Sequence, residues 1–273
     1  MMETLKTALT IAGSDPSGGA GVQADLKTFS ALGVFGTSAI TALVDENTMG
    51  VYGIHPVPVD FVKGEIRSVL SDVGADAIKI GMLHDSELIE GVLAALKEYP
   101  GIRNIVVDPV MVATSGDPLL QEDAVATLRD ILIPYARIIT PNLPEASLLL
   151  GENLAHQDQL EDAAIQLSKM YGGECVSVML KAGHLDNDRL IDIFYNAEKG
   201  TVIRLESEKI ATVNTHGTGC TLSSAIAAWL AKGGDLDTAV KNAKTYLIGA
   251  LQKGATLKIG KGHGPVHHFY SWW

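Results

Sequence analysis

Short runs of apolar, mostly β-branched residues alternate along the chain with longer stretches that are apolar on one side only. The short runs predict buried strands, and the longer stretches predict amphipathic helices. In the first longer stretch, Val22, Leu26 and Phe29 recur at helical spacing. The predicted strands are 7–12, 36–44, 75–81, 104–109, 136–141 and 175–183. The predicted helices are 20–32, 59–72, 86–99, 121–132, 158–171, 218–232 and 235–252.

This alternation of strands and helices indicates the fold class. Near-continuous apolar strands need cover on both faces, so the pattern predicts an α/β fold with a mostly parallel central sheet between helices. Residues 189–207 depart from the rhythm and predict two strands around a loop at 196–200, which would form a small antiparallel edge. Neither a repeat nor a linker interrupts the chain, so residues 1–273 are predicted to form a single domain.

Composition narrows the class of protein. The formal net charge of −11 argues against a surface that binds nucleic acid or an anionic membrane. The N-terminal apolar run is too short for a signal sequence or a membrane span. Cys175 and Cys220 are far apart and lack C-x-x-C spacing, so neither a disulfide framework nor a structural zinc site is predicted. These features are consistent with a reducing cytoplasm.

Polar and glycine-rich residues follow the predicted strand ends, where ligands bind in open α/β sheets. Lys181 ends one strand and could reach a phosphate, while Asp108, Asn142 and Glu145 follow two others. Their hard oxygen ligands suit Mg²⁺, directly or through its waters. Each residue alone also fits ordinary turn chemistry. Their joint placement predicts a phosphoryl-transfer site, which needs positive charge and positioned donors.

The first glycine loop looks like a dinucleotide cradle but fits that template badly. Residues 19–24 match G-x-G-x-x-A, yet the predicted strand ends near Ala12 and a Rossmann glycine should follow it almost at once. A Walker A loop would need G-K-[ST] after its last glycine, where this chain has Gly21-Val22-Gln23. Asp25 lies one turn into the next helix. Its carboxylate either caps the helix, where the positive end of the helix dipole favours a negative charge, or accepts hydrogen bonds from a substrate.

The second glycine loop, residues 215–220, leads directly into the predicted helix 218–232. Its small residues would let backbone N–H groups point outward together at the helix N-terminus, which makes an anion site. A tight turn with a close-packed helix start is the alternative. Cys220 lies at this helix start, where a thiol pKa is lowered. The alternative for Cys220 is a small buried apolar residue.

Six segments together resemble the bacterial hydroxymethylpyrimidine/phosphomethylpyrimidine kinase family of thiamine biosynthesis, within the ribokinase-like superfamily. The segments are ALTIAGSDPSGGAGVQADLKTFSALG, DPVMVATSGDPLL, ITPNLPEASLLLG, LKAGHL, NTHGTGCTLSSAIAA and GHGPVHHF. The resemblance implies a ribokinase-like three-layer α/β/α sandwich and a homodimer. It also implies ATP-dependent phosphorylation of 4-amino-5-hydroxymethyl-2-methylpyrimidine to its monophosphate and then to the diphosphate.

The same resemblance implies roles for individual residues. The residues implied around ATP and the transferred phosphate are Asn142, Lys181, Thr215, Gly217, Thr218 and Gly219. The residues implied around Mg²⁺ are Asp108 and Glu145, and a K⁺ requirement stays open. The residues implied around the pyrimidine are Gly13, Asp25, Glu46, Met82 and Cys220. The first glycine loop would therefore serve the pyrimidine, and the second would hold the phosphates.

Two of these residues carry specific expectations. Cys220 stands where many sugar kinases of the superfamily have an aspartate base, so it would accept the proton of the hydroxymethyl group. Glu46 stands where relatives usually carry Gln. An ionised carboxylate accepts a hydrogen bond from the pyrimidine amino group but cannot donate one to a ring nitrogen.

Three other functions compete with the pyrimidine kinase. Related pyridoxal kinases carry a Cys in the segment that here reads MVATSG, so its absence favours the pyrimidine, and a pyridoxal or pyridoxine kinase is the alternative. A nucleotide-dependent dehydrogenase would rest on residues 19–24, with Asp45 or Glu46 as the acid that binds the ribose. A catalytically inactive pyrimidine sensor would not need the full set of strand-end residues.

Overall fold

The structure is a computed structural model that describes residues 4–113, 116, 119–121, 123–170, 176–183, 185 and 188–273. Cys175 and the Thr114–Ser115 part of the MVATSG segment, both named above, lie outside the described residues.

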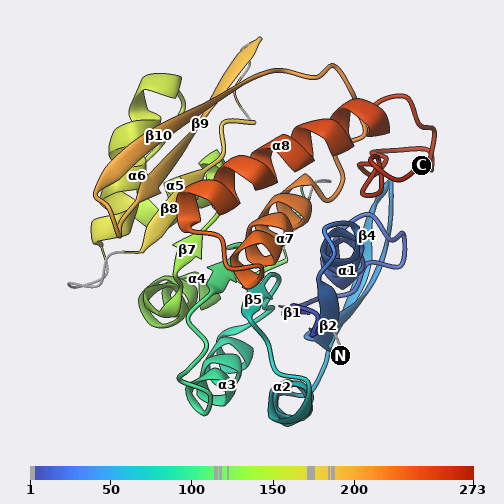
Figure 1. The fold of residues 1–273 in the computed structure, drawn as a ribbon, viewed down its shortest axis with the longest axis vertical. Helices are drawn as coiled ribbons and strands as arrows, with labels where there is room; N and C mark the ends of the chain where they lie inside the picture. The colour runs from blue at the N-terminus through green and yellow to red at the C-terminus, as the bar shows by residue number, and fades with distance from the viewer. Residues whose placement is uncertain are drawn as a thin grey trace.

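An eight-stranded sheet forms the middle of the molecule, in the order β10-β9-β8-β7-β6-β5-β1-β2 (Figure 1). Its parallel strands are β1 (Thr7–Ala12), β2 (Phe35–Ile40), β5 (Ala77–Ile80), β6 (Ile105–Val107), β7 (Ile138–Ile139) and β8 (Ser177–Leu180). Strand β9 (Arg189–Asn196) pairs antiparallel with both β8 and β10 (Thr201–Glu208). The predicted antiparallel edge is therefore confirmed.

Helices cover both faces of this sheet, which confirms the predicted three-layer α/β/α fold. One face carries α1 (Gly21–Ala31), α7 (Thr218–Ala231) and α8 (Leu236–Gly254). The other face carries α2 (Val59–Asp72), α3 (Ser86–Lys97), α4 (Ala124–Thr127), α5 (Leu143–Leu150) and α6 (Leu160–Lys169). Each face has its own buried apolar cluster. Among the helices described, none combines the length and apolar character that crossing a bilayer requires.

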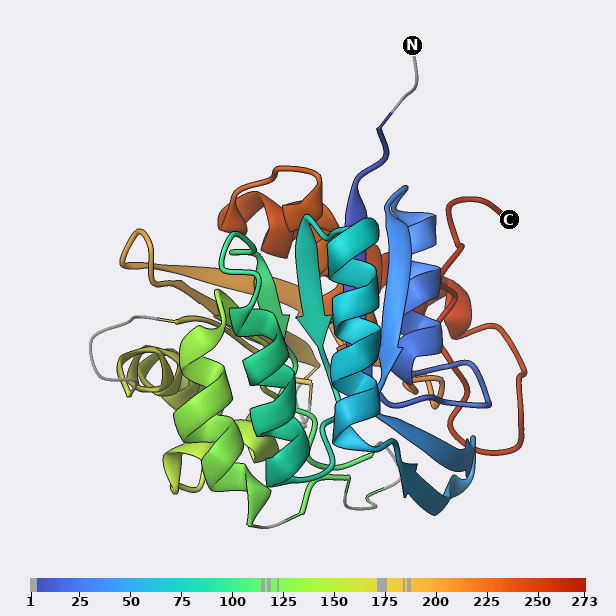
Figure 2. The same cartoon turned by 90° about the horizontal axis from the view of Figure 1, so that it is seen from below.

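The prediction of one strand over 36–44 is wrong in its second half. Strand β2 ends at Ile40, and β3 (Ala42–Asn47) pairs antiparallel with β4 (Gly50–Pro56) as a separate two-stranded sheet. Figure 2 shows this ribbon projecting beyond the main sheet at lower right. The apolar run continues through both strands without a glycine or proline after Gly36, so the pattern gives no sign that the chain changes sheets.

Two helical segments also differ from the predicted pattern. Only the middle of the predicted helix 121–132 is α-helical, because α4 continues as a π-helical turn (Leu128–Leu132) and a 3₁₀ turn (Ile133–Tyr135). Helix α5 is not among the predicted helices. Its N-cap is Asn142, which forms a capping box with Glu145. A second 3₁₀ turn (Gln157–Gln159) precedes α6.

Candidate active site

The carboxyl ends of the parallel strands carry many of the predicted site residues along one edge of the sheet. The residues that follow β1, β5, β6, β7 and β8 are Gly13, Met82, Asp108, Asn142 and Lys181. Parallel strands end at the same edge, so residues distant in sequence become neighbours there. Asn142 and Lys181, for example, form a parallel bridge directly beyond β7 and β8.

Lys181 and Asp108 form the centre of one group of charges. The Lys181 ammonium lies 3.2 Å from Asp108 Oδ1 and 4.0 Å from Glu145 Oε2. Asp108 also accepts hydrogen bonds from Thr140 Oγ1 at 2.8 Å and from Ser223 Oγ at 3.3 Å. The Lys181 side chain is 16 % exposed, whereas the Asp108 side chain is 2 % exposed. A cation therefore lies over a buried carboxylate at the strand ends.

The two carboxylates of this group differ in protonation. Burial alone would raise the pKa of Asp108, but Lys181 and the buried Lys79 outweigh it and hold that pKa below its usual range. Burial raises the pKa of Glu145 to about 7, since the attraction of Lys181 is offset partly by Asp108. Asp108 is consequently ionised at neutral pH, and Glu145 is close to its midpoint.

These carboxylates suit Mg²⁺ in chemistry, with one constraint from geometry. Carboxylate oxygens are the ligands that Mg²⁺ prefers, and the ion usually keeps several of its waters. Lys181 already lies between Asp108 and Glu145, and Glu145 Oε2 accepts a hydrogen bond from the Asn142 backbone at 2.7 Å. Contact through the waters of the ion therefore fits this pair better than direct ligation does.

Helix α7 points its first turn at this charged group. A Cβ atom on Gly219 would lie 3.4 Å from both Asp108 Oδ2 and Lys181 Nζ, so the helix start directly adjoins them. Gly217, the N-cap of α7, has φ = 77°, a conformation that residues with a side chain rarely adopt. The N–H groups of a helix start are free to bind an anion, so Lys181 and α7 together offer charge and backbone donors at one place.

The two glycine loops pack against each other. A Cβ atom on Gly217 would overlap the carbonyl oxygen of Gly19, and a Cβ atom on Gly21 would lie 2.5 Å from the Gly13 carbonyl oxygen. Only glycine allows the backbones to approach this closely. The loop after β1 and the loop before α7 therefore lie side by side.

Asp15 holds the first loop in shape. Its carboxylate accepts hydrogen bonds from the backbone N–H groups of Ser17, Gly19 and Ala20 at 2.7, 2.8 and 2.6 Å. His216 Nε2 of the second loop lies 2.9 Å from Asp15 Oδ2. The His216 side chain of the second loop therefore holds the Asp15 side chain of the first loop in place.

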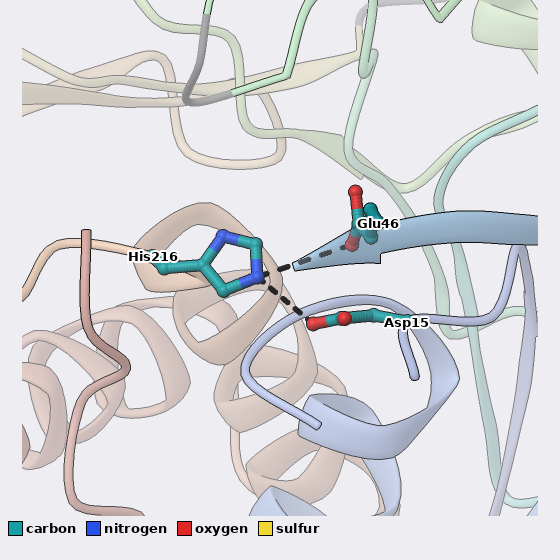
Figure 3. A group of neighbouring side chains, drawn as sticks. All are labelled: Asp15, Glu46 and His216. Carbon is teal, nitrogen blue, oxygen red and sulfur yellow. Dashed lines mark hydrogen bonds and ion pairs between the residues drawn. The ribbon is translucent and has the colours of Figure 1, made fainter. Parts of the chain in front are cut away.

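Glu46 completes a group that we call the Asp15–His216–Glu46 cluster (Figure 3). Glu46 Oε1 lies 3.9 Å from His216 Nε2, and the Glu46 side chain is 10 % exposed. The nitrogen and oxygen atoms concerned all lie within 4.8 Å of one another. Figure 3 shows His216 facing both carboxylates, which come from the loop after β1 and from β3.

The apolar side of the predicted pyrimidine pocket lies beside this cluster. A Cβ atom on Gly13 would lie 3.0 Å from Met82 Sδ and 3.6 Å from Val44 Cγ2. Met82 and Val44 belong to a small buried cluster with Ala42 and Leu119. The structure therefore brings Gly13 and Met82 together, with Glu46 two residues beyond Val44 on the same strand.

Asp25 occupies a different environment from the other predicted pyrimidine residues. It is fully buried, and its oxygens accept hydrogen bonds from Thr10 at 2.6 Å and Ser224 at 2.6 Å. Lys79, also fully buried, donates to both Asp25 oxygens at 3.0 and 2.8 Å. We call these two residues the Asp25–Lys79 pair. A direct substrate contact at Asp25 would have to displace one of these protein donors.

Cys220 does not have the lowered pKa that its place at a helix start predicts. Burial raises the pKa of the Cys220 thiol to about 12, although Lys79 and a hydrogen bond from the Gly21 backbone favour the thiolate. Of the two interpretations of Cys220, the thiol of lowered pKa is therefore the one that the structure contradicts. Cys220 is a protonated thiol at neutral pH, next to both glycine loops.

Several residues of the site have no role in the predictions from sequence: Asp15, Lys79, Thr140, His216, Ser223 and Ser224. An Asp-Pro-Ser turn at Asp15 is a visible signal for a carboxylate that caps local backbone. Lys79 carries a second signal, because it is a charged residue inside the apolar strand AIKI and needs a buried partner. Neither signal identifies the partner.

Comparison with known proteins supports one family. The family model described as phosphomethylpyrimidine kinase matches residues 15–267. The hydroxymethylpyrimidine/phosphomethylpyrimidine kinase of Escherichia coli (strain K12) is 49 % identical over 266 residues, which cover 97 % of this chain and 98 % of that protein.

Two solved structures share the fold over almost the whole chain. The phosphomethylpyrimidine kinase of Clostridium difficile 630 has a TM-score of 0.77 at 39 % identity, and the alignment covers 90 % of this chain and 99 % of that one. The pyridoxal kinase of Staphylococcus aureus, in complex with AMP-PCP and pyridoxal, has a TM-score of 0.87 at 34 % identity, with 99 % and 96 % covered. The predicted ribokinase-like fold and phosphotransferase class are thereby confirmed.

Proposed function

The chain belongs to the phosphomethylpyrimidine kinase family, and we propose that it phosphorylates 4-amino-5-hydroxymethyl-2-methylpyrimidine in thiamine biosynthesis. ATP is the phosphate donor, and the product monophosphate receives a second phosphate at the same site. The observation that carries this proposal is the convergence of Lys181, Asp108 and the start of α7 at the strand ends. Phosphoryl transfer depends mainly on such positioned charge and donors.

The nucleotide belongs on the side of the second glycine loop. The backbone of Gly217 and Gly219 offers N–H donors for phosphate oxygens, and that of Thr218 also donates to the Thr215 carbonyl oxygen at 3.3 Å. Lys181 supplies a positive charge next to them, and its 16 % exposed side chain can reach a ligand. Thr215 flanks this region within the second glycine loop. Asn142, the N-cap of α5, flanks it on another side.

Magnesium belongs beside Asp108 and Glu145. Mg²⁺ neutralises charge on the ATP phosphates in kinases, and these two carboxylates suit its water shell. Glu145 is near its midpoint at neutral pH, so a nearby cation would favour its ionised form. The homodimer and the cytoplasmic location are further parts of this proposal.

The pyrimidine belongs on the side of the first glycine loop. Gly13 and Met82 offer a flat apolar wall, and Glu46 supplies a polar group at its end. Asp25 supports this side of the site indirectly, through its hydrogen bonds to residues of β1, β5 and α7. The hydroxymethyl arm then faces Cys220, next to the phosphate side.

Cys220 accepts the proton of the hydroxymethyl group as its oxygen attacks the γ-phosphate. The thiol must first release its own proton to solvent, which burial opposes and the nearby Lys79 ammonium favours. The second phosphorylation has a phosphate as nucleophile, and a phosphate needs no strong base. We therefore expect Cys220 to matter for the first step and much less for the second.

Mass spectrometry of the products tests this function directly. The protein is incubated with Mg-ATP and the pyrimidine, with pyridoxal in a parallel reaction. The expected result is a pyrimidine that gains first one and then two phosphates. Phosphorylation of pyridoxal alone would contradict the pyrimidine assignment. That alternative is kept because the S. aureus pyridoxal kinase superimposes with a TM-score of 0.87.

A further inference from the structure

Glu46 is a carboxyl group that shares its ion-pair partner, His216, with Asp15, which lies closer to the imidazole. It lies on β3, where the pairing with β4 shifts register between Asp45 and Glu46. Such a shift re-aims side chains at the edge of a site. The Glu46 side chain is nine-tenths buried and faces the Asp15–His216 contact rather than solvent.

Asp15 and His216 already neutralise each other. Burial would raise the pKa of Asp15, but His216 and the loop N–H groups hold it well below its usual range. Burial likewise opposes charge on His216, but Asp15 outweighs it and raises the His216 pKa. Both shifts favour the charged forms, and the charges of a carboxylate and an imidazolium cancel each other within the pair. Glu46 adds a second buried negative charge that nothing in the pair compensates.

Other charges near Glu46 do not change this balance. Titratable residues on β3, on its partner strand β4 and on the neighbouring loops are Asp15, His216, Asp45, Tyr52, His55, Lys261 and His263, and those of β4 are exposed. Asp45 is exposed, and Lys261 and His263 bond the turn at Thr48 through their backbone N–H groups. A proton therefore relieves the excess charge most directly. In agreement, burial next to Asp15 raises the pKa of Glu46 to about 7.

A protonated Glu46 carboxyl matches one edge of an aminopyrimidine. It presents one O–H donor and one carbonyl acceptor side by side. A 4-aminopyrimidine presents an amino donor next to a ring-nitrogen acceptor. The ionised carboxylate accepts only, so it satisfies the amino group and leaves the ring nitrogen against a negative charge.

We propose that this chain binds its pyrimidine together with one proton held at Glu46, within the Asp15–His216–Glu46 cluster. The proton comes from solvent and ends on the carboxyl oxygen that faces the ring nitrogen. Affinity for an aminopyrimidine therefore falls as the pH rises. Pyridoxal has a ring nitrogen but no amino group next to it, so it can use the O–H donor of Glu46 but not the neighbouring acceptor. This inference rests on the proposed function.

Calorimetric titration of the pyrimidine into the wild-type protein and the Glu46→Gln variant tests the inference. Gln carries a donor and an acceptor at every pH, so it replaces the protonated carboxyl. For the wild type we expect the Kd to rise about tenfold for each pH unit above about 7, which is the slope for one linked proton. For Glu46→Gln we expect a flat profile over this range. Buffers of different ionisation enthalpy report the same proton as a difference in measured heat.

Controls separate this inference from the proposed function. The Asp45→Asn variant removes the neighbouring exposed charge and should keep the wild-type slope. The ring nitrogen of the free pyrimidine titrates equally in all three experiments, so only the difference between proteins counts. Equal slopes for wild type and Glu46→Gln would overturn the inference while leaving the kinase function intact. Failure of both proteins to bind the pyrimidine at about pH 6 would contradict the function, and the inference with it.

Discussion

Two clusters of charged side chains lie next to the first glycine loop, and they differ in how their charges are balanced. In the Asp25–Lys79 pair, both side chains are fully buried and every charge has a partner. The Asp25 oxygens accept from Lys79, Thr10 and Ser224, and the Lys79 pKa lies above its usual range because Asp25 outweighs the effect of burial. This pair joins β1, β5 and α7 and leaves no opening for a ligand.

The Asp15–His216–Glu46 cluster has two carboxylates and one imidazole. Its Glu46 and His216 side chains are each 10 % exposed, whereas both side chains of the Asp25–Lys79 pair are 0 % exposed. Glu46 lies 3.9 Å from the imidazole, whereas Asp15 lies at 2.9 Å. The contacts of this cluster change with the position of a single proton.

The comparison separates two uses of buried charge. A balanced and closed pair fixes the positions of strands and a helix, and breaking it costs stability. An unbalanced cluster that is open on one side lowers the stability of the protein on its own. Binding of a proton or a ligand restores that stability. The first glycine loop is supported by one kind, and in the proposed function it binds its ligand through the other.

The strongest test of the closed pair is removal of its cation. Lys79→Met leaves the Asp25 carboxylate buried without a counter-charge, which costs about 3–5 kcal/mol in the free energy of unfolding. Urea denaturation at neutral pH measures this loss. The double variant Lys79→Met/Asp25→Asn removes both charges and should regain part of the stability. A loss below about 1 kcal/mol in the single variant would mean that the pair is not a support of the fold.

Cys220 lies near the Asp25–Lys79 pair, and its replacement tests what the buried charge does for catalysis. We expect Cys220→Ala to reduce the first phosphorylation by about 10²–10⁴-fold, the usual contribution of a positioned base, with little effect on ATP binding. The second phosphorylation should be much less affected. Rates of the two steps are measured separately, with the pyrimidine or its monophosphate as substrate.

Cys220→Ser distinguishes a base from a hydrogen-bonding group. A serine hydroxyl is a far weaker acid than a thiol, so a base role predicts that Ser is nearly as damaging as Ala. Recovery of the first step by Ser, or unchanged turnover with Ala, would reduce Cys220 to packing or hydrogen bonding.

Lys181 is an intermediate case, a cation over a buried carboxylate but 16 % exposed. Lys181→Met should lower kcat/KM for ATP by about 10²–10³-fold, as loss of one charge-stabilising donor does. Binding of the pyrimidine, measured by calorimetry, should change little. The variant should also lose less stability than Lys79→Met, because Asp108 keeps Lys79 and Thr140 nearby. Equal losses for ATP and pyrimidine would contradict the placement of Lys181 on the nucleotide side.

Local rules made the general fold and the strand-end residues predictable. The spacing of apolar residues identifies strands and helices one at a time, and parallel strands necessarily gather Asp108, Asn142 and Lys181 at one edge. The rules failed where the outcome depends on distant partners. Residues 36–44 read as one strand, but the second half pairs with β4 in another sheet.

The two charge clusters could not be predicted from the sequence either, because their partners are also distant in the sequence. Lys79 contacts Asp25, which lies 54 residues away in the sequence, and His216 contacts Asp15, which lies 201 residues away. A helix start predicts a lowered pKa for Cys220, but the burial that raises it comes from the packing of both glycine loops. The departure from Gln at Glu46 was visible in the sequence, whereas the imidazolium that makes it matter was not.

The mildest test addresses the cost of the unbalanced cluster in the free protein. Because burial beside Asp15 raises the Glu46 pKa to about 7 from its ordinary 4.5, the folded protein binds this proton more tightly than the unfolded chain does. That contribution to the free energy of unfolding is complete below pH 4.5 and is lost as the pH rises through 7. Glu46→Gln removes the titration, so it should match the wild type at about pH 5 and exceed its stability by about 1–3 kcal/mol at about pH 8.5.

Urea denaturation at both pH values measures the difference between these two proteins. The contributions of Asp15 and His216 occur in both proteins and largely cancel, although the His216 pKa should fall somewhat once Glu46 no longer attracts its proton. Asp45→Asn serves as the control for a lost surface charge and should show no such dependence on pH. A Glu46→Gln variant that is equally stable or less stable than the wild type at the higher pH would mean that Glu46 is compensated in the folded protein. The cluster would then be as balanced as the Asp25–Lys79 pair, and the distinction between the two groups would fail.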